Sequence, residues 1–506
     1  MDEFDLDQPL IDIFSPQEHN YWTARHAVEG VQIFGGIGSG KTSGSGRLLA
    51  LKYLINGFGG LVLTVKPDEK AAWQEYAQLT GRTDDLLIIE PGGEHCFNFL
   101  EYESQHATGE KAITENIVEV LKTVIRAGNE KDTGKSDDAF WETALDMLIF
   151  NVIDLCKLAY NYISIQDMYD IVQTVPKGEQ ALQAQTKTAP DKAYRKAMAA
   201  AQSNVNVQID AWFLTLPFDM QERLRENNAL FEMEMLEAIP DARLLKFVDQ
   251  FFVDNFITLS DKTRSIIDFS FSSFLFRLLR EPIYSMFCRY ASTITPEDSL
   301  DGKIILINLP VKIYQKVGRD CQILFKYIWQ RAMEKRDQTH NNWPVFLWAD
   351  EAQNFLHEHD ADYQATARSS RIATVYISQN IPNYYACMGG QKAEYRVKSF
   401  LGTLATKIFH ANADIETNKY ASELIGEIYF EDESESVTVA KDFSQTRGKS
   451  LRLERIVRAE EFVRLKTGGP LNHYYVEGYL HRQGDRVAKG FNHVKMVFNQ
   501  VYQPQS

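Results

Sequence analysis

The feature that most constrains this chain is the stretch GGIGSGKTS, from Gly35 to Ser43. It lies between a short apolar run, GVQIF, and a helix-like segment, SGRLLALKYL. It matches the pattern G-x-x-x-x-G-K-[ST] of phosphate-binding loops. Glycines permit the positive φ angles that turn successive backbone N–H groups toward a phosphate, and the following helix adds its positive end. The sequence therefore predicts a strand, a P-loop and a helix that together bind a nucleotide.

Each residue type in the loop suggests a role. We expect Lys41 to reach the β and γ phosphates, and the Thr42 hydroxyl to hold Mg²⁺. The predicted ligands are accordingly ATP and Mg²⁺. The remaining positions expected to line the phosphates are Gly35, Gly36, Gly38, Ser39, Gly40 and Ser43.

A P-loop hydrolase also needs a carboxylate at the end of a second buried strand. In VFLWADEAQ, an apolar run from Val345 to Ala349 is followed by Asp350 and Glu351. We expect Asp350 to position Mg²⁺ and Glu351 to polarise the attacking water. A solvated turn or a helix cap is the alternative interpretation of this pair. Together with the P-loop, the glutamate favours a hydrolase over a kinase. The sequence has no NKxD motif for guanine recognition, which argues against a GTP switch.

Two further polar positions follow the acidic pair. Gln379 ends the apolar run TVYISQ, at the place where a sensor of the γ-phosphate would lie. Just upstream, Arg368 and Arg371 are candidates for an arginine finger that projects into a neighbouring subunit's site. The alternatives are an ordinary amide at a strand end and solvated or ion-paired surface arginines.

Short apolar runs alternate with helix-like segments in two separate parts of the chain. The first part contains VQIF, LVLTV and LLIIE, and the second contains KIILINL, WPVFLWADE, TVYISQ and TLATKIFHAN. This alternation is typical of a parallel sheet flanked by helices. Between the two parts the strand signal disappears, and stretches such as DKAYRKAMAAAQSNVNVQIDAWF have helical periodicity. The predicted fold is α/β with a mostly parallel sheet, split by an inserted all-α domain.

This interpretation divides the chain into five parts. They are an N-terminal segment (1–29), the first part of the nucleotide-binding domain (30–100), the all-α insertion (101–296), the second part of the nucleotide-binding domain (297–480) and a C-terminal tail (481–506). Beyond about residue 426 the pattern is less regular. There FEDESES is expected to be a charged loop, and SVTVA and LRLERIV small strands.

Composition limits the function further. The 506 residues include 54 Lys and Arg against 69 Asp and Glu, for a net charge of -15, which is unlike a protein that coats nucleic acid uniformly. A local basic channel stays compatible with this charge. The acidic N-terminus does not resemble a signal peptide, and the best apolar stretch, from Leu145, is interrupted by charged residues. We therefore expect a cytoplasmic protein in which this stretch is a buried helix.

Several segments, in this order, resemble the type IV secretion coupling proteins. These are conjugative DNA-transfer ATPases of the TraG/TraD type, within the FtsK-HerA class of P-loop ATPases. The similar segments are GGIGSGKT, VKPDE, CFNFL, DDAFWETALDML, FLWADEAQNF and ISQN, followed by NADIETNKYASELIG and IVRAEEFVRLKTGG. The resemblance implies a RecA-like nucleotide-binding domain, a ring of six subunits and ATP hydrolysis at the subunit interfaces. It also implies delivery of single-stranded DNA, with a relaxase, to a type IV secretion channel.

Matched by position to the family's motifs, Lys41 and Thr42 would contact the phosphates and Mg²⁺, and Asp350 and Glu351 would be the metal and catalytic carboxylates. The resemblance also implies that Gln379 is the sensor. Arg368 stands eleven residues before Gln379, where the family's trans-acting arginine is expected.

One departure from the family bears on location and function. Its members usually begin with transmembrane helices, whereas only about 30 residues precede the P-loop strand here. Either a separate subunit anchors the protein at the inner membrane, or it is a soluble relative, or the fold serves elsewhere. The predicted function is a coupling ATPase that recruits and pumps DNA or a nucleoprotein. The alternatives are a soluble FtsK-HerA translocase in genome processing or phage defence, and a nucleotide-gated adaptor for protein substrates.

Overall fold

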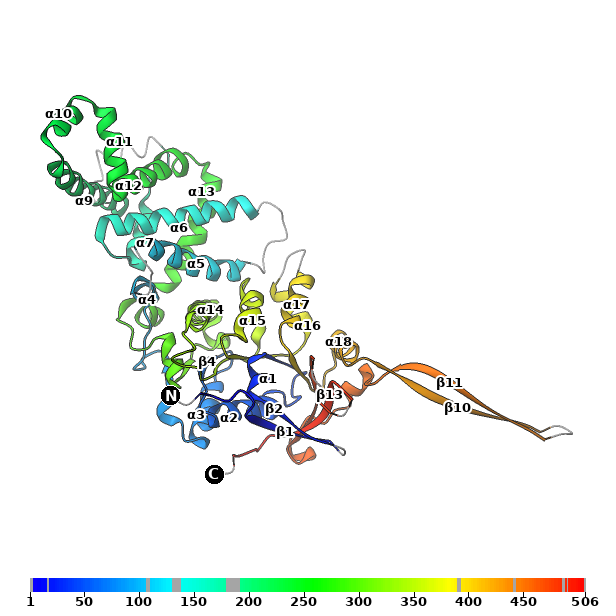
Figure 1. The fold of residues 1–506 in the computed structure, drawn as a ribbon. Coiled ribbons are helices and arrows are strands. Elements are labelled where there is room, and N and C mark those ends of the chain that lie inside the picture. Colours follow the sequence, from blue (N-terminus) through cyan, green and yellow to red (C-terminus); the bar gives the residue numbers. More distant parts are fainter. Residues whose placement is uncertain are drawn as a thin grey trace. The chain divides into compact units, whose positions relative to one another are not determined.

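The computed structural model divides the chain into two compact units (Figure 1). The sheet unit comprises Met1–Ile88, Glu130–Asp132 and Pro296–Ser506, and the helical unit comprises Ile89–Asn129 and Thr133–Thr295. The helical unit is thus inserted into the chain of the sheet unit. The structure describes residues 3–15, 18–105, 110–129, 138–178, 192–388, 393–439, 443–484, 487–488 and 490–504.

The sheet unit is built on a large mixed sheet with the strand order β13-β12-β9-β3-β8-β7-β4-β6-β5. All pairs from β9 to β6 are parallel, whereas β12 and β13 run antiparallel. The central strands are buried along their whole length, as expected of a parallel sheet covered on both faces. The strands are β3 (Val31–Phe34), β4 (Gly59–Leu63), β5 (Leu86–Ile89), β6 (Ile304–Ile307), β7 (Val345–Ala349), β8 (Ile372–Ser378), β9 (Thr406–Phe409), β12 (Tyr475–Arg482) and β13 (His493–Asn499).

Helices cover both faces of this sheet (Figure 1). On one face lie α2 (Arg47–Ile55) and α3 (Glu69–Leu79), and on the other α14 (Val311–Lys335) and α15 (Asp360–Ala367). Right-handed crossovers explain the division, because the chain moves one way along the sheet from β3 to β5 and the other way from β6 to β9. The carboxyl ends of β3, β4, β7 and β8 therefore lie along the same side of the sheet, called here its carboxyl-terminal edge. In α/β proteins, ligands bind at this side.

The prediction of a C-terminal tail over residues 481–506 is wrong for most of that segment. Strand β12 continues to Arg482, and His493–Asn499 form β13, which pairs with β12. At this sheet edge only Phe498 of β13 is fully buried, so the strand has little of the apolar signal that marks the central ones. The N-terminal segment forms a hairpin, β1 (Pro9–Ser15) with β2 (Glu18–Thr23), followed by α1 (Ala24–Val28).

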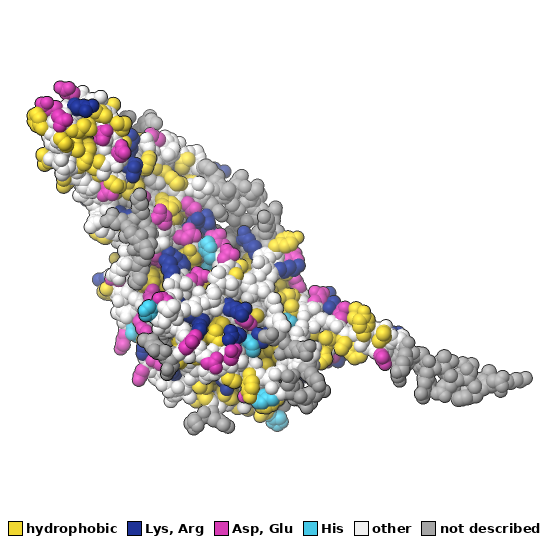
Figure 2. Space-filling model, in the orientation of Figure 1, with side chains coloured by type: hydrophobic (Ala, Val, Ile, Leu, Met, Phe, Trp, Pro, Cys, Tyr) yellow, Lys and Arg dark blue, Asp and Glu magenta, His cyan; other side chains and the backbone are white. Residues whose placement is uncertain are grey.

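The prediction that FEDESES forms a charged loop is also wrong, since this segment lies within strand β10 (Glu427–Val439). This strand pairs in antiparallel register with β11 (Phe443–Arg455) to form a two-stranded ribbon. The ribbon contains the predicted small strand SVTVA, apart from Ala440, which lies outside the described residues, and LRLERIV as far as Arg455; Ile456 and Val457 follow the end of β11. Pairing with the partner strand here outweighs the low strand propensity of Asp and Glu. Hydrophobic side chains are exposed on the described part of the ribbon, including Tyr429 (68%) and Leu451 (67%) (Figure 2).

The helical unit accounts for the middle of the chain. In α6 (Asp138–Tyr160), Leu148, Val152 and Leu155 are fully buried, which confirms the expected buried helix. Among the described residues, no single helix is both long and apolar enough to span a membrane. The segments Thr143–Tyr160 and Ile165–Thr174 meet those criteria only jointly, across a bend of 111°. The helices include α4 (Phe99–Gln105), α5 (Glu110–Asn129), α6 (Asp138–Tyr160), α7 (Ile165–Thr174), α9 (Ala193–Thr215), α10 (Phe218–Glu226), α11 (Asn228–Ala238), α12 (Pro240–Gln250) and α13 (Asp261–Leu278).

Candidate nucleotide-binding site

The P-loop joins β3 to α2 at the carboxyl-terminal edge of the sheet. Gly38 and Gly40 have φ angles of 72° and 79°, a conformation that side chains rarely adopt. At Gly40 a Cβ would also lie 2.5 Å from the Val476 side chain. The Gly46 N–H donates to the Lys41 carbonyl (2.9 Å), so the helical turns begin directly after the loop. The predicted strand, loop and helix are therefore present in this order.

The loop has the form of a cradle for an anion. Ser39 is buried, and its hydroxyl has no hydrogen-bond partner in the part of the chain that the structure describes. At Gly35 a Cβ would lie 2.4 Å from the Ser39 Oγ, so the glycine keeps the loop closed around its centre. Lys41 is also buried (7% exposed). A buried ammonium and a free buried donor beside a helix N-terminus suit the phosphates of a nucleotide.

The acidic pair follows β7 and meets the P-loop. The Thr42 hydroxyl donates to Asp350 Oδ2 at 2.8 Å, although the two residues are 308 positions apart in the chain. Asp350 Oδ1 accepts the Glu351 N–H (2.8 Å), and Glu351 has a φ of 51°, in the left-handed region. Strained backbone of this kind is concentrated at functional sites. A hydroxyl and one carboxylate are the usual protein ligands of a nucleotide-bound Mg²⁺, so the residues fit this ion.

Glu351 lies at the centre of a network of charged and amide groups. It accepts hydrogen bonds from Gln353 (2.8 Å) and Gln379 (3.2 Å). Burial would raise the pKa of its carboxyl, but these hydrogen bonds and the positive charges of Lys41 and Lys66 lower it below its usual value. Glu351 is thus held as a carboxylate beside the P-loop lysine, which is the state that a general base for water requires.

Lys66 is a member of this site that the sequence analysis did not identify. Its Nζ lies 3.3 Å from Asp350 Oδ2 and 3.8 Å from Glu351 Oε1. Close by, Glu69 accepts the Val65 N–H through Oε2 (2.7 Å), and burial together with the charge of Asp350 raises its pKa to about 8. The available signal was the polar stretch VKPDE at the end of an apolar run, the same arrangement that identified Asp350.

Two more residues that were not predicted, His410 and Gln500, make side-chain contacts with serines at the start of the segment after Lys41. His410, at the end of β9, lies 2.7 Å from the Ser45 hydroxyl through Nε2 and 2.9 Å from the Glu477 carbonyl through Nδ1. Burial lowers its pKa to about 4, so its ring is neutral. Gln500, beyond β13, donates to the Ser43 hydroxyl (2.6 Å). The segment that was expected to be a tail therefore contributes to the P-loop surroundings.

The two candidate arginines lie away from these residues. Arg368 caps α15 at the amino-terminal end of β8; its side chain is 64% exposed and lies 3.5 Å from Glu29. Arg371 is bound within the chain, because its guanidinium donates to the Asn342 carbonyl at 2.8 Å and its side chain is 16% exposed. Only Arg368 is thus accessible to another molecule, and neither arginine reaches this chain's own P-loop edge.

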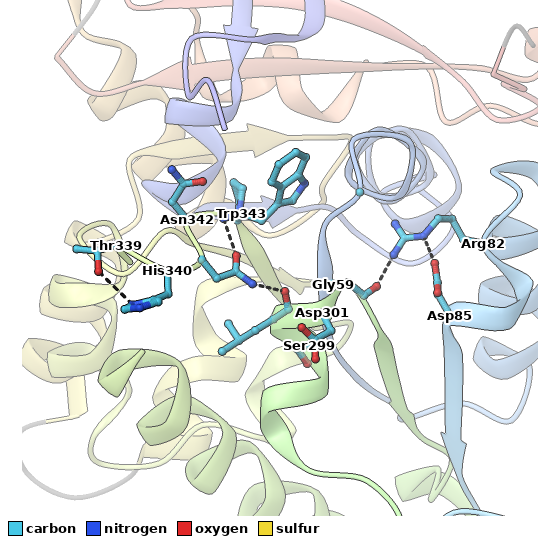
Figure 3. Close-up of a pocket in the computed structure, with 14 residues that line it drawn as sticks. Gly59, Arg82, Asp85, Ser299, Asp301, Thr339, His340, Asn342 and Trp343 are labelled. Atoms are coloured by element: carbon cyan, nitrogen blue, oxygen red, sulfur yellow. Dashed lines mark hydrogen bonds and ion pairs between the residues drawn. The ribbon is translucent and has the colours of Figure 1, made fainter. Parts of the chain in front are cut away.

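A second hollow lies at that amino-terminal edge (Figure 3). It has a volume of about 600 Å³, and its lining includes Gly59, which begins β4, and Pro344, which precedes β7. Two of its charged groups, Arg82 and Asp85, are paired with each other at 2.5 Å. The hollow is therefore separate from the candidate nucleotide site, at the opposite ends of the same strands.

Comparisons with known proteins bear on the family and the fold. Residues 344–467 match a family model described as the TraM recognition site of TraD and TraG. This segment contains Asp350, Glu351, Arg368 and Gln379. No curated protein matches the chain by sequence.

Solved structures of bacterial conjugative coupling protein TrwB share the fold. The unbound monoclinic form of TrwBdeltaN70 has a TM-score of 0.59 at 13% identity, covering 95% of this chain and 87% of that chain. TrwB in complex with the ATP analogue ADPNP has a TM-score of 0.56 at 14% identity, covering 95% of this chain and 87% of that chain. TrwB in complex with ADP and Mg²⁺ has a TM-score of 0.57 at 13% identity, covering 96% of this chain and 88% of that chain. The resemblance to coupling proteins and the predicted fold, RecA-like and split by an α-helical insertion, are therefore confirmed.

Proposed function

Starting from this resemblance in motifs and fold, we propose that the protein is an ATP-hydrolysing coupling ATPase that moves DNA. The observation that carries the proposal is the convergence of Lys41, Thr42, Asp350, Glu351 and Gln379 at one sheet edge. These residues come from three strand ends that lie far apart in the sequence. A kinase has no need of a buried, ionised glutamate beside the metal carboxylate, whereas a hydrolase uses it to activate water.

Each residue of the site has a part in this reaction. The P-loop N–H groups and Lys41 bind and orient the phosphates, and Thr42 and Asp350 would hold Mg²⁺. When bound, that ion supplies charge neutralisation at the β and γ phosphates. Glu351 accepts the proton of the attacking water, and Gln379, already bonded to Glu351, orients that water relative to the γ-phosphate. His410 and Gln500 hold the loop in place from behind.

The same geometry supports action as a ring of subunits. Arg368 is exposed and points away from its own P-loop, so the nucleotide it would contact belongs to a neighbouring copy. Within the P-loop, the side chain of Ile37 is 89% exposed. Exposed hydrophobic side chains beside a functional site mark a surface for protein contacts. We propose a homo-hexamer in which each Arg368 completes the site of the next subunit.

The proposed substrate is single-stranded DNA with its relaxase, delivered to a type IV secretion channel. TrwB is a conjugative coupling protein by its description, and the matched family model is named for recognition of TraM by TraD and TraG. For the present chain we propose a cytoplasmic location, with attachment at the inner membrane through the channel or a separate anchor subunit.

The proposal is tested by the ATPase rate of the purified full chain with and without single-stranded and double-stranded DNA, with light scattering for mass. We expect hydrolysis that DNA stimulates and a mass near six subunits. Stimulation by double-stranded DNA alone would favour a soluble FtsK-HerA translocase. Nucleotide binding with slow turnover that DNA leaves unchanged would contradict the motor and favour the adaptor.

A further inference from the structure

The ammonium of Lys66 lies where a divalent cation would be expected. It is 3.3 Å from Asp350 Oδ2, the same oxygen that accepts the hydrogen bond from the Thr42 hydroxyl. It is also 3.8 Å from Glu351 Oε1, so one positive charge faces both carboxylates of the acidic pair. These are the groups to which the proposed function assigns the metal and the attacking water.

The charges around this point explain why a cation is needed there. The side chains of Asp350 and Glu351 are 4% and 9% exposed, and two carboxylates held so close in a buried place repel each other. Removing Lys66, a cation that contacts both members of the pair, would leave buried charge uncompensated, which is costly.

Lys66 is also placed so that it can leave. Its side chain is 28% exposed, far more than the carboxylates it contacts. It follows β4 and precedes α3, which begins at Glu69, so the backbone is fixed on both sides while the four-carbon side chain is free to turn. Lysine presents a compact, mobile charge, unlike the rigid fork of arginine.

We propose that Lys66 is a displaceable counter-ion, which holds the place of Mg²⁺ between Asp350 and Glu351 until the metal-bound nucleotide arrives. In this role Lys66 is a positioning residue, because it keeps the acidic pair in the geometry that the metal then uses. Its displacement couples metal binding to the end of β4 and therefore to α3. The inference rests on the proposed nucleotide site and adds to it a competition between the protein's own cation and the metal.

The test is the affinity of the full chain for Mn²⁺ in the presence of saturating ADP, followed by electron paramagnetic resonance. In Lys66→Met the competing ammonium is gone, and we expect Mn²⁺ to bind about tenfold more tightly, because a nearby like charge is worth that order at a partly buried site. Lys66→Gln, which keeps a hydrogen-bond donor without the charge, should show the same direction. Lys66→Arg, which keeps the charge, should bind Mn²⁺ no more tightly than the wild type.

The matched control is Lys303→Met. Lys303 is exposed to a similar degree (35%) and pairs with Asp85 at 2.8 Å, but at the opposite edge of the sheet. Its Mn²⁺ affinity should equal that of the wild type. A second readout is thermal unfolding without nucleotide, in which Lys66→Met should be less stable than the wild type, with Mg²⁺ restoring much of the difference.

The outcomes separate this inference from the proposed function. Unchanged or weaker Mn²⁺ binding in both Lys66→Met and Lys66→Gln, while the wild type binds Mn²⁺ and ADP, would overturn the counter-ion role alone. Failure of the wild type to bind the metal and ADP together would overturn the nucleotide site itself.

Discussion

The two edges of the central sheet arrange their charges in different ways. At the carboxyl-terminal edge, Lys41 and Lys66 face Asp350 and Glu351 in a buried place, and these residues come from separate elements. At the amino-terminal edge, Asp85 pairs with both Arg82 and Lys303, and the side chains of Asp85 and Lys303 are 31% and 35% exposed. Charges that pair beside solvent need no ligand, whereas a buried group of charges is costly unless it serves one. This difference distinguishes the proposed nucleotide site from the surface hollow.

Arg368 complicates this comparison in an informative way. It belongs to the amino-terminal edge, and its side chain, which is 64% exposed, forms a 3.5 Å ion pair with Glu29, which is 13% exposed and also pairs with Arg482. An ion pair with one solvated partner contributes little to stability. If the edge serves a neighbouring subunit, the two edges form the two halves of one composite site.

The largest expected effect tests this composite site. Arg368→Ala should lower turnover by about 10³-fold or more, as for other trans-acting arginines, while leaving ADP affinity unchanged. Mixing it with Lys41→Ala should restore part of the activity, because a subunit with an intact P-loop then meets a neighbour with an intact arginine. The measurement is the ATPase rate of each variant and of the equal mixture. An inactive mixture of assembled subunits would show that the arginine does not act in trans.

A somewhat smaller effect is expected from the carboxyl-terminal edge. Glu351→Gln should lower turnover by about 10²- to 10⁴-fold, the usual contribution of a general base. Nucleotide affinity should persist because Lys41 and Thr42 are intact. The matched control at the other edge is Asp85→Asn, for which turnover should stay near that of the wild type. Both are measured by single-turnover hydrolysis with ADP affinity by calorimetry. Near-normal turnover in Glu351→Gln would remove Glu351 from the mechanism.

The smallest effect concerns acid stability. Burial lowers the pKa of His410 to about 4, below its usual 6.5, so its contribution is complete above pH 6.5 and is lost as the pH falls toward 4. Between pH 7.5 and 5, this residue should account for a loss of about 2 kcal/mol in the free energy of unfolding. His410→Asn should reduce that loss, as measured by urea unfolding at the two pH values. His340→Asn, at a side chain that is 86% exposed, is the control and should keep the wild-type pH dependence.

The local patterns predicted most of the core and the centre of the site. Every predicted apolar run of the two α/β parts overlaps a strand of the sheet, because buried parallel strands require continuous hydrophobic residues. The P-loop and the acidic pair were predictable because their chemistry depends on residue types at fixed spacings. Strand β13 and most of the β10–β11 ribbon, beyond its two predicted small strands, were missed, since edge and ribbon strands bury few side chains and depend on their pairing partner.

By itself, the sequence determined that the chain contains a P-loop, an acidic strand end and a helical insertion, because each is written in consecutive residues. The tertiary structure decided which distant residues complete the site. Lys66, His410 and Gln500 meet the P-loop surroundings through contacts across 284 to 457 positions of the chain. Such contacts follow from strand order and crossover direction, and no short pattern encodes them. The same order places Arg368 at the opposite edge, beside Glu29, and the proposed contact of Arg368 with a nucleotide would therefore be to that of another subunit.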